Sequence, residues 1–460
     1  MGDVPASAAR VRPDTARALL ARAARAQIEG RAPSTSVGVG RDGVLVWHTG
    51  RGTLDGSREG AESTPDTQYR IGSITKTFTA ALVLQLRDEG RIDLNDRLGD
   101  YVEGTPFGDV RLRDLLAHAA GLAAEPPGSW WEREPGVPWA DLAATFDADR
   151  LLDAGGRFHY SNVGYALLGE LVARMRSMPW YDALRAYVLD PLGMTRTTYA
   201  PQPPHAPGLA VHPFADVTMA EAVHDHVAMA PAGQLWSTVG DLVRWASFLG
   251  GDTDDVLAAE TIVEMRQPQV LAQEAPFDGY GLGLQVFHVD DRELVGHGGS
   301  VPGFLASLVI DIERGVAAIE LANATAGRPF CGAELLAILE QHEPTVPSAW
   351  APAMGVTADW ADLAGLWHWG PAAFHIRLVG ADWLELSSAT GAARSSSFVR
   401  RDGAWVGTSG YWAGELLALV RRRDGSASHL DVGTFIFTRQ PYDPDAPIPG
   451  GVSPNPWATD

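Results

Sequence analysis

Ile71-Gly72-Ser73-Ile74-Thr75-Lys76 places a hydroxyl and an amine three residues apart, at the start of an apolar stretch that runs to Leu86. Residues at positions i and i+3 are neighbours on one surface of a helix, so the lysine amine can reach the serine oxygen and accept its proton. Because the stretch is apolar on nearly every side, we predict a helix buried in the middle of a domain and ended by Gly90.

Lys76 is the only lysine in 460 residues, and the other 35 of the 36 basic residues are arginine. An ammonium can lose its proton when it is desolvated, whereas a guanidinium stays charged, and a salt bridge would not need this difference. The pattern Ser-x-x-Lys is common at helix starts and is weak by itself. The exclusive use of lysine at this position favours a proton-accepting function.

The composition describes a soluble globular chain, with 45% hydrophobic and 20% charged residues. Its 57 acidic and 36 basic residues give a net charge of −21, which argues against nucleic acid and anionic membranes as partners. Cys331 is the only cysteine, so an internal disulfide is excluded. We find no secretory signal and no membrane-spanning stretch, and we expect a cytoplasmic protein.

Strand patterns stand at both ends of the first 343 residues, with helical patterns between them. The predicted strands are a hairpin over 36–47 and segments over 280–289, 293–297, 304–311 and 316–321. The predicted helices cover 113–119, 165–175, 181–188, 239–249 and 333–341. We therefore expect an α+β fold in which the first and last parts share one antiparallel sheet and the helical middle forms a second lobe. Ser73 would lie between them.

The chain is expected to contain further segments around this α+β domain. Short strands at regular intervals, separated by glycine or aspartate turns, follow a Pro/Ala-rich stretch and predict a small C-terminal β-barrel. The expected segments are an N-terminal helix in 1–32, the α+β domain over 33–343, a linker over 344–358, the barrel over 359–442 and a tail over 443–460.

Tyr160-Ser161-Asn162 lies at the end of a loop that leads into a helix. Tyrosine and asparagine two residues apart occur in many turns, so the tripeptide alone favours a structural role. Beside a serine and lysine pair it gains a second meaning. A phenol near an ammonium can carry a proton between the serine and a leaving group, and an amide can hold a substrate carbonyl.

Val295 to Phe304 gathers glycines at one end of a predicted strand and includes His297, Gly299 and Ser300. Glycine inside a strand often marks the close approach of another backbone or a ligand. The main-chain N–H of Ser300, together with that of Ser73, could then hold an oxyanion. The alternative is a tight turn that carries a solvent-facing histidine.

The remaining histidines give no strong site. His118 is interpreted as a hydrogen-bonded loop histidine rather than a catalyst. His224 and His226 have metal-like spacing without a convincing third ligand. We therefore predict neither a metal nor a cofactor.

The three motifs together resemble the serine β-lactamase and penicillin-binding-protein superfamily. The branch includes class C β-lactamases, DD-carboxypeptidases, D-aminopeptidases of the S12 peptidase group and β-lactamase-like esterases. Ser73 to Lys76 looks like the family's SxxK, Tyr160 to Asn162 like its YxN, and His297 to Gly299 like its KTG-type strand motif in the HxG form. Leu115 to Leu122 is similar to its LLxHxSGL segment. The resemblance covers about residues 33–342, and the C-terminal barrel looks like the lipocalin-type domain of some members.

The resemblance implies a function for each matched residue. Ser73 would be the acylated nucleophile, Lys76 its base and Tyr160 a proton relay. Asn162 would bind substrate, and His297 would form a wall and a possible carboxylate partner. The chain departs from the family where histidine replaces the strand lysine and where Ala120 replaces a serine. A neutral imidazole attracts a carboxylate less than an ammonium does, which favours weak or absent β-lactamase activity.

Three functions stay open at this point. The leading hypothesis is a serine hydrolase that forms an acyl-enzyme on a small ester or a D-configured amide or peptide. The second is acyl transfer, as in the penicillin-binding-protein-type thioesterases that cyclise peptides. The third is a non-catalytic binding or sensor protein on the same fold, which the intact Ser73, Lys76 and Tyr160 disfavour. The sequence does not predict the oligomeric state.

Overall fold

The computed structural model describes residues 10–147, 152, 156–272, 277–289, 292–327, 330–344, 346, 349–352, 360–391, 394–401, 403–443 and 446. The chain divides into two compact units, residues 1–345 and 346–460. Most of the predicted linker over 344–358 and of the predicted tail over 443–460 lies outside the described residues.

The first unit contains one antiparallel sheet of eight described strands in the order β2-β1-β12-β11-β10-β9-β8-β7. Their bounds are β1 (Ser34–Arg41), β2 (Val44–Gly52), β7 (Val270–Leu271), β8 (Gly279–Tyr280), β9 (Gln285–Val289), β10 (Arg292–Val301), β11 (Phe304–Asp311) and β12 (Val316–Ala322). Val37 pairs with Glu320, and β1 pairs with β12 along its length. The prediction that the two ends of this domain share one sheet is therefore confirmed.

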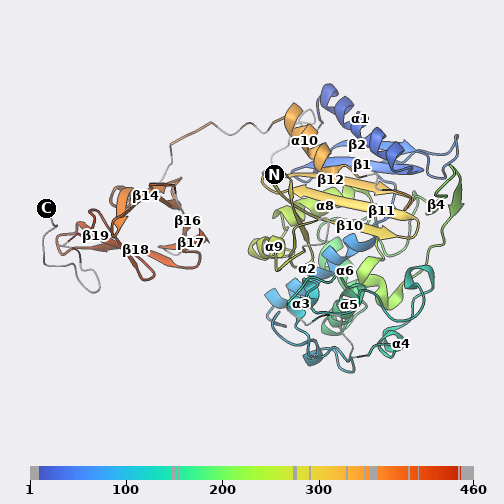
Figure 1. Ribbon diagram of the computed structural model, residues 1–460, viewed down its shortest axis with the longest axis horizontal. Helices are drawn as coiled ribbons and strands as arrows, with labels where there is room; N and C mark the ends of the chain where they lie inside the picture. Colours follow the sequence, from blue (N-terminus) through green and yellow to red (C-terminus); the bar gives the residue numbers. More distant parts are fainter. Residues whose placement is uncertain are drawn as a thin grey trace. The chain divides into compact units, whose positions relative to one another are not determined.

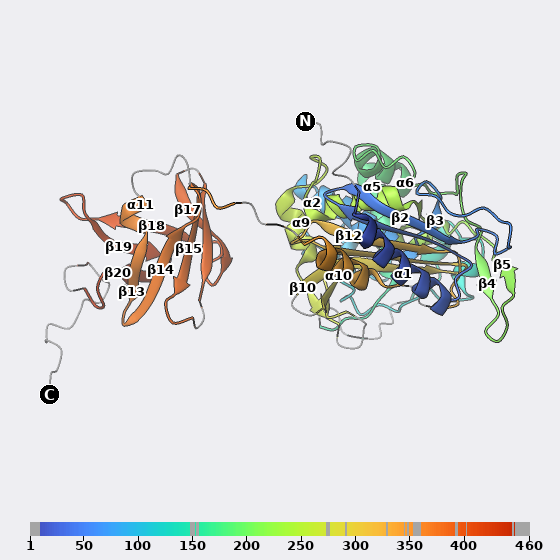
Figure 2. The same cartoon turned by 90° about the horizontal axis from the view of Figure 1, so that it is seen from above.

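Helices cover both faces of this sheet. On one face, α1 (Pro13–Glu29) and α10 (Gly332–His342) lie side by side across the strands (Figures 1 and 2). On the other face, α8 (Val239–Gly250) packs against β1, β2, β11 and β12. A Cβ on Gly38 or Gly40 of β1 would collide with Val239 or Val243 of α8. The small residues of β1 therefore let this helix approach the sheet closely.

The helical region contains the predicted buried helix, α2 (Thr75–Asp88), in which every residue from Thr75 to Leu86 is buried. It packs against α5 and α7. The other helices of this unit are α3 (Leu112–Leu116), α4 (Trp139–Ala143), α5 (Asn162–Arg176), α6 (Trp180–Leu184), α7 (Ala230–Gly233) and α9 (Ala259–Arg266). Two short pairings complete it, β3 (Tyr69–Arg70) with β6 (Trp236–Ser237) and β4 (Leu209–Val211) with β5 (Thr218–Ala220).

Several predicted boundaries differ from the structure, among them the strand predicted over 293–297, which extends to Val301, and three of the differences have a local reason. The segment predicted as one strand over 280–289 is two strands, because Gly283 at φ 89° turns the chain between them. The helix predicted over 113–119 ends at Leu116, since His118 adopts a left-handed φ of 56°. The helix predicted over 181–188 changes to π-helical geometry at Arg185.

The second unit is a closed antiparallel barrel, as predicted. Its helix α11 (Trp360–Leu363) leads into β13 (Gly365–Trp369), β14 (Ala372–Leu378), β15 (Trp383–Ser388), β16 (Ser396–Arg401), β17 (Ala404–Gly410), β18 (Leu416–Arg421), β19 (Ala427–Val432) and β20 (Phe435–Thr438). Buried aromatic and aliphatic side chains fill its interior, among them Trp367, Phe374, Phe398 and Phe437. Across the described residues of both units, no helix has the length and apolar character needed to cross a membrane.

Candidate active site

Ser73 lies in a 3₁₀ turn, Gly72–Ile74, that runs directly into α2. Gly72 has a left-handed φ of 50°, a conformation that glycine adopts without steric cost. The turn leaves the Ser73 side chain partly exposed, although the residues on both sides of it are buried. The hydroxyl is thus accessible at the start of a rigid, buried helix.

Lys76 follows one helical turn later and is fully buried. Its amine donates three hydrogen bonds, to Ser73 Oγ at 3.0 Å, to Asn162 Oδ1 at 2.7 Å and to the carbonyl oxygen of Ala232 at 2.7 Å. Burial lowers the pKa of Lys76 to about 7, against a smaller opposite effect of the Glu125 and Glu132 carboxylates. A substantial fraction of this amine is therefore neutral near pH 7.

Asn162 is the first residue of α5 and owes its position to the cap before it. Ser161 Oγ accepts a hydrogen bond from the Gly164 N–H at 3.1 Å and donates to the Ala123 carbonyl at 2.7 Å. The Asn162 Nδ2 group donates to Glu125 Oε1 at 2.8 Å. This bond fixes the amide orientation, so the oxygen faces Lys76.

The Tyr160 ring lies beside the same amine, with its centroid 4.9 Å from Lys76 Nζ. Burial raises the pKa of Tyr160 well above its usual range, and a hydrogen bond with Ser73 acts more weakly in the opposite direction. Tyr160 is therefore a neutral phenol at physiological pH. It can pass a proton on, but Lys76 is the group that is able to accept one from Ser73.

Strand β10 passes directly against the Ser73 turn. A Cβ on Gly299 would stand 1.9 Å from the Ile71 carbonyl oxygen and 3.3 Å from the Ser73 nitrogen, and one on Gly72 would stand 2.7 Å from the Ser300 nitrogen. The close backbone approach that the glycine-rich stretch predicts is therefore present. It brings the main-chain nitrogens of Ser73 and Ser300 close to each other.

Gly298 behaves differently from its neighbour Gly299. A Cβ at this position would meet nothing within 4 Å. A side chain at Gly298 would therefore project into open space, on the side of the strand opposite to the one on which Gly299 meets the Ser73 turn.

His297 lies beneath the surface of the site, with 1% of its area exposed. It is therefore not the solvent-facing histidine of the alternative interpretation. Its Nδ1 contacts the Gly298 carbonyl oxygen at 2.5 Å and its Nε2 lies 3.0 Å from the Tyr280 hydroxyl. Burial lowers the pKa of His297 to about 3, so the ring is neutral. Nδ1 then donates to the carbonyl and Nε2 accepts from the phenol. Both nitrogens are occupied, and contact with a substrate carboxylate stays a prediction.

His118 supports the neighbouring loop, as interpreted from the sequence. Its Nδ1 accepts a hydrogen bond from the Ser161 N–H at 3.0 Å, and its ring lies 4.1 Å from that of Tyr160. Burial lowers the pKa of His118 well below its ordinary value. A neutral, buried imidazole thus holds the Tyr160 to Asn162 segment in place.

Three residues of the site carried no signal that sequence reasoning could use. Ala232 contributes only its main-chain carbonyl to Lys76. Glu125 reaches Asn162 from an irregular loop and also accepts from the Trp131 indole at 2.7 Å. Tyr280 stands behind His297. Within the described part of the chain, no group of three or more potential metal ligands gathers, and His226 packs against the Arg70 guanidinium.

Comparison with known proteins agrees with this arrangement. A family model described as "Beta-lactamase" matches residues 15–342, and one described as a domain of unknown function, DUF7586, matches residues 356–439. The Escherichia coli K12 protein D-alanyl-D-alanine-carboxypeptidase/endopeptidase AmpH is 26% identical over 281 residues, which are 55% of this chain and 70% of that one. Penicillin-binding protein 4 of Amycolatopsis lactamdurans is 28% identical over 296 residues, which are 59% of this chain and 76% of that protein.

Solved structures extend the similarity. A structure of SurE is 26% identical, has a TM-score of 0.58 and covers 93% of this chain and 99% of its own. A D-stereospecific amidohydrolase from Streptomyces is 25% identical, with a TM-score of 0.59 and coverage of 71% and 98%. The first similarity spans both units and the second spans about the length of the first unit. With a family model that matches most of its residues, this chain belongs to the Beta-lactamase family of serine hydrolases and penicillin-binding proteins.

Proposed function

We propose that this protein is a serine hydrolase that forms a covalent acyl-enzyme on Ser73, with small D-configured amides, peptides or esters as substrates. The three hydrogen bonds of Lys76 carry the proposal. Its tetrahedral nitrogen has three directions available, and Asn162 and Ala232 each need one N–H. When the ammonium loses a proton, the lone pair therefore points to Ser73 Oγ.

The reaction that follows uses the remaining groups in turn. Ser73 Oγ attacks the substrate carbonyl while its proton moves to Lys76, and the main-chain N–H groups of Ser73 and Ser300 stabilise the oxyanion. The Tyr160 phenol then delivers its proton to the leaving amine or alkoxide and takes a replacement proton from the Lys76 ammonium, so both groups return to their starting states. Water, activated by the same groups, attacks the ester carbonyl and releases the acid together with free Ser73.

The substrate class is supported by the names of two similar proteins and by local charge. One is a D-alanyl-D-alanine-carboxypeptidase/endopeptidase and the other a D-stereospecific amidohydrolase. In addition, Glu125 and Glu132 lie close enough to Lys76 to raise its pKa. Their negative charge favours an acyl group that carries a free amino group over one that carries a carboxylate.

Mass spectrometry of the intact protein tests the proposal. The chain is incubated with a fluorophosphonate and with matched substrates, namely D- and L-phenylalanine amides, their N-acetyl forms, a simple aryl ester, a peptidyl thioester and a penicillin. We expect one adduct with the fluorophosphonate, located on Ser73 and absent from Ser73→Ala. We also expect turnover of the free D-amide ahead of its N-acetyl form. Stoichiometric labelling of Ser73→Ala would refute the nucleophile.

Two alternatives have distinct signatures in the same experiment. Acyl transfer predicts that added amines divert the acyl group into a new amide, whereas hydrolysis releases the acid. A non-catalytic binding protein predicts no adduct and no product with any member of the panel. The contacts of Lys76 with Ser73 and Tyr160 favour either catalytic function over a binding protein, and the names of the similar hydrolytic proteins favour hydrolysis over acyl transfer.

A further inference from the structure

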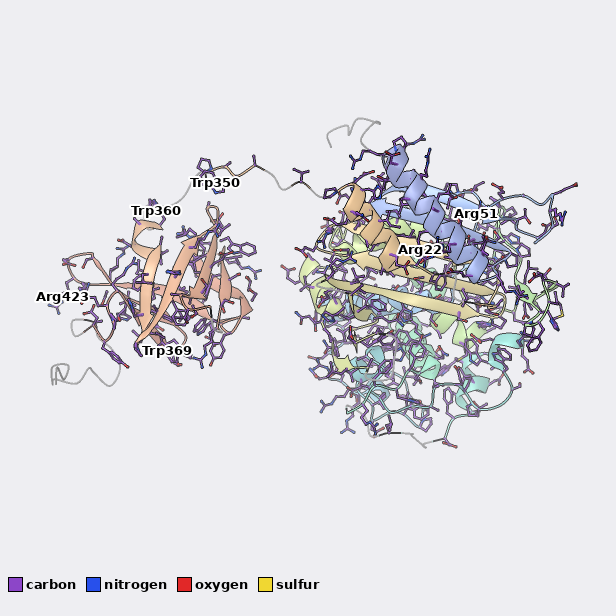
Figure 3. All side chains as sticks on the ribbon, turned by 45° about the horizontal axis from the view of Figure 1, so that its top comes forward. Arg22, Arg51, Trp350, Trp360, Trp369 and Arg423 are labelled. Carbon is purple, nitrogen blue, oxygen red and sulfur yellow. The ribbon has the colours of Figure 1, made fainter. Side chains whose placement is uncertain are left out.

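Four loops meet at one end of the C-terminal barrel. In an up-and-down barrel, alternate connections lie at the same end. The strand ends at the connections β13–β14, β15–β16, β17–β18 and β19–β20, with the described residues between them, therefore form one mouth, which contains Trp369, Arg394, Tyr411 and Phe435. Figure 3 shows Trp369 at the end of the barrel opposite Trp360 of α11.

Arg394 is held among three aromatic rings of this mouth. Its guanidinium carbon lies 4.9 Å from the Trp369 ring centroid, 4.6 Å from that of Tyr411 and 5.6 Å from that of Phe435. The residue has a left-handed φ of 62°, which is uncommon for a side chain of this size. The backbone thus adopts an unfavourable conformation where the guanidinium is placed between the rings.

Arg394 has no ion-pair partner in the described part of the chain, and one of its donor atoms is buried. Its Nη1 atom is buried and has no acceptor, and no ion pair joins it to a described carboxylate. Ring stacking occupies the faces of a guanidinium, whereas its five N–H donors lie in its plane. Its Nε and Nη2 donors are not shielded in this way, so they are the ones that a ligand at the mouth could reach.

A second unpaired donor lies behind the same rings. Trp412 is 1% exposed, its ring packs 5.2 Å from Tyr411 and 5.4 Å from Phe435, and its indole N–H has no acceptor. Two buried donors thus share one end of the barrel.

The walls of the mouth are apolar and partly open to solvent. Trp369 is 37% exposed and Tyr411 is 55% exposed, so both rings can cover a flat ligand. The barrel interior below them is filled by side chains such as Phe374 and Phe437. A ligand therefore fits at the mouth rather than inside. The Glu415 carboxylate lies beside Gly433 at this end and would repel an anion.

We propose that this mouth binds an organic carboxylate with a flat apolar body. The carboxylate pairs with the free edge of the Arg394 guanidinium, while Trp369 and Tyr411 contact the apolar part. A guanidinium is matched to a carboxylate by geometry as well as charge. This binding site is independent of the chemistry proposed for Ser73.

Calorimetric titration of the full chain with 2-naphthoate tests the proposal, with neutral 2-naphthamide as the matched ligand. We expect binding of the naphthoate and at least about tenfold weaker binding of the amide, because the amide lacks the charge-assisted pair. Arg394→Gln should weaken naphthoate binding by about tenfold or more. Arg423→Gln removes an exposed arginine between β18 and β19, at the other end of the barrel, and should leave it unchanged.

Two further variants keep the test decisive if Arg394→Gln unfolds the barrel. Arg394→Lys retains the charge but loses the planar fork and should bind more weakly than the native chain, and Glu415→Gln should bind at least as tightly. In protein labelled with 5-fluorotryptophan, the Trp369 and Trp412 resonances should move during titration of the native chain. Equal affinity of native protein and Arg394→Gln, equal binding of the two ligands, or unmoved resonances would each overturn the proposal.

Discussion

The Lys76 amine and the Asn162 amide oxygen are 2.7 Å apart, although 86 positions separate the two residues in sequence. Glu125 holds the other end of the amide at 2.8 Å. A chain of hydrogen bonds therefore runs from an exposed carboxylate to a fully buried amine. The amine therefore cannot rotate freely. Two of its three hydrogen-bonding directions are taken by Asn162 and Ala232, and the third points to Ser73 Oγ.

Replacement of Lys76 by arginine separates charge from basicity. The Lys76→Arg variant keeps a cation but removes the only group of the site that can accept the Ser73 proton near pH 7. We expect the rate of Ser73 acylation by a fluorophosphonate or an aryl ester to fall by about a hundredfold or more. Thermal unfolding of the variant provides the control for folding. A near-native acylation rate in a folded variant would contradict the assigned function of Lys76.

The pH profile of acylation should report the same amine. Burial lowers the pKa of Lys76 to about 7, and the reactive form is the neutral one. Activity measured as kcat/KM is therefore expected to rise between about pH 6 and 8 and then to level off. An amine with its ordinary pKa of 10.5 would instead give a rise that continues well beyond pH 9. A profile that falls through neutral pH would exclude Lys76 as the base.

Glu125→Gln should displace that profile in a known direction. The Glu125 carboxylate raises the pKa of Lys76, and the glutamine oxygen can still accept from Asn162. Loss of the negative charge is expected to move the midpoint of the profile to lower pH, by less than one pH unit because Glu125 is exposed. Glu134→Gln, a nearby exposed replacement, serves as the control. A midpoint that moves to higher pH would contradict the inference that the Glu125 charge raises the pKa of Lys76.

The site could be predicted from sequence where its chemistry is local. Ser73 and Lys76 are one helical turn apart, so their contact follows from helix geometry alone. Strand alternation likewise predicted the shared sheet and the barrel. By contrast, the Ala232 carbonyl has no side-chain signature, and Glu125 comes from a loop whose path depends on tertiary packing. The neutral state of His297 depends on its burial, which no short motif encodes.

Two adjacent glycines offer a matched pair of substitutions. Gly299→Ala would place a Cβ 1.9 Å from the Ile71 carbonyl and displace β10 from the Ser73 turn. We expect a stability loss of about 1–3 kcal/mol and an acylation rate lower by about a hundredfold. Gly298→Ala faces open space and should keep both native stability and a native acylation rate. Equal thermal stability and equal rates in the two variants would refute the close approach inferred for β10.

Glu320 provides a pH effect on stability at a distance from the active site. It is a buried residue of β12 whose carboxylate accepts from the Cys331 N–H at 2.8 Å, at the start of α10. Burial raises its pKa from 4.5 to about 7, so the folded chain binds a proton there that the unfolded chain releases. The stabilisation is complete below about pH 4.5 and is lost as the pH rises to about 7, which corresponds to about 3 kcal/mol.

Glu320→Gln should remove this dependence, because the amide cannot ionise. The free energy of unfolding is measured by chemical denaturation for the native chain and the variant, each at pH 5.5 and pH 8. The change between the two pH values is then compared for the two proteins, so that the contributions of the other titrating groups cancel. We expect the native chain to lose more stability than Glu320→Gln on going to pH 8. Glu334→Gln is the control: it replaces the exposed carboxylate that pairs with Arg22 of α1. Its stability should depend on pH in the same way as that of the native chain. If native protein and Glu320→Gln respond identically, the Glu320 carboxyl is already ionised at pH 5.5 and its pKa is not raised.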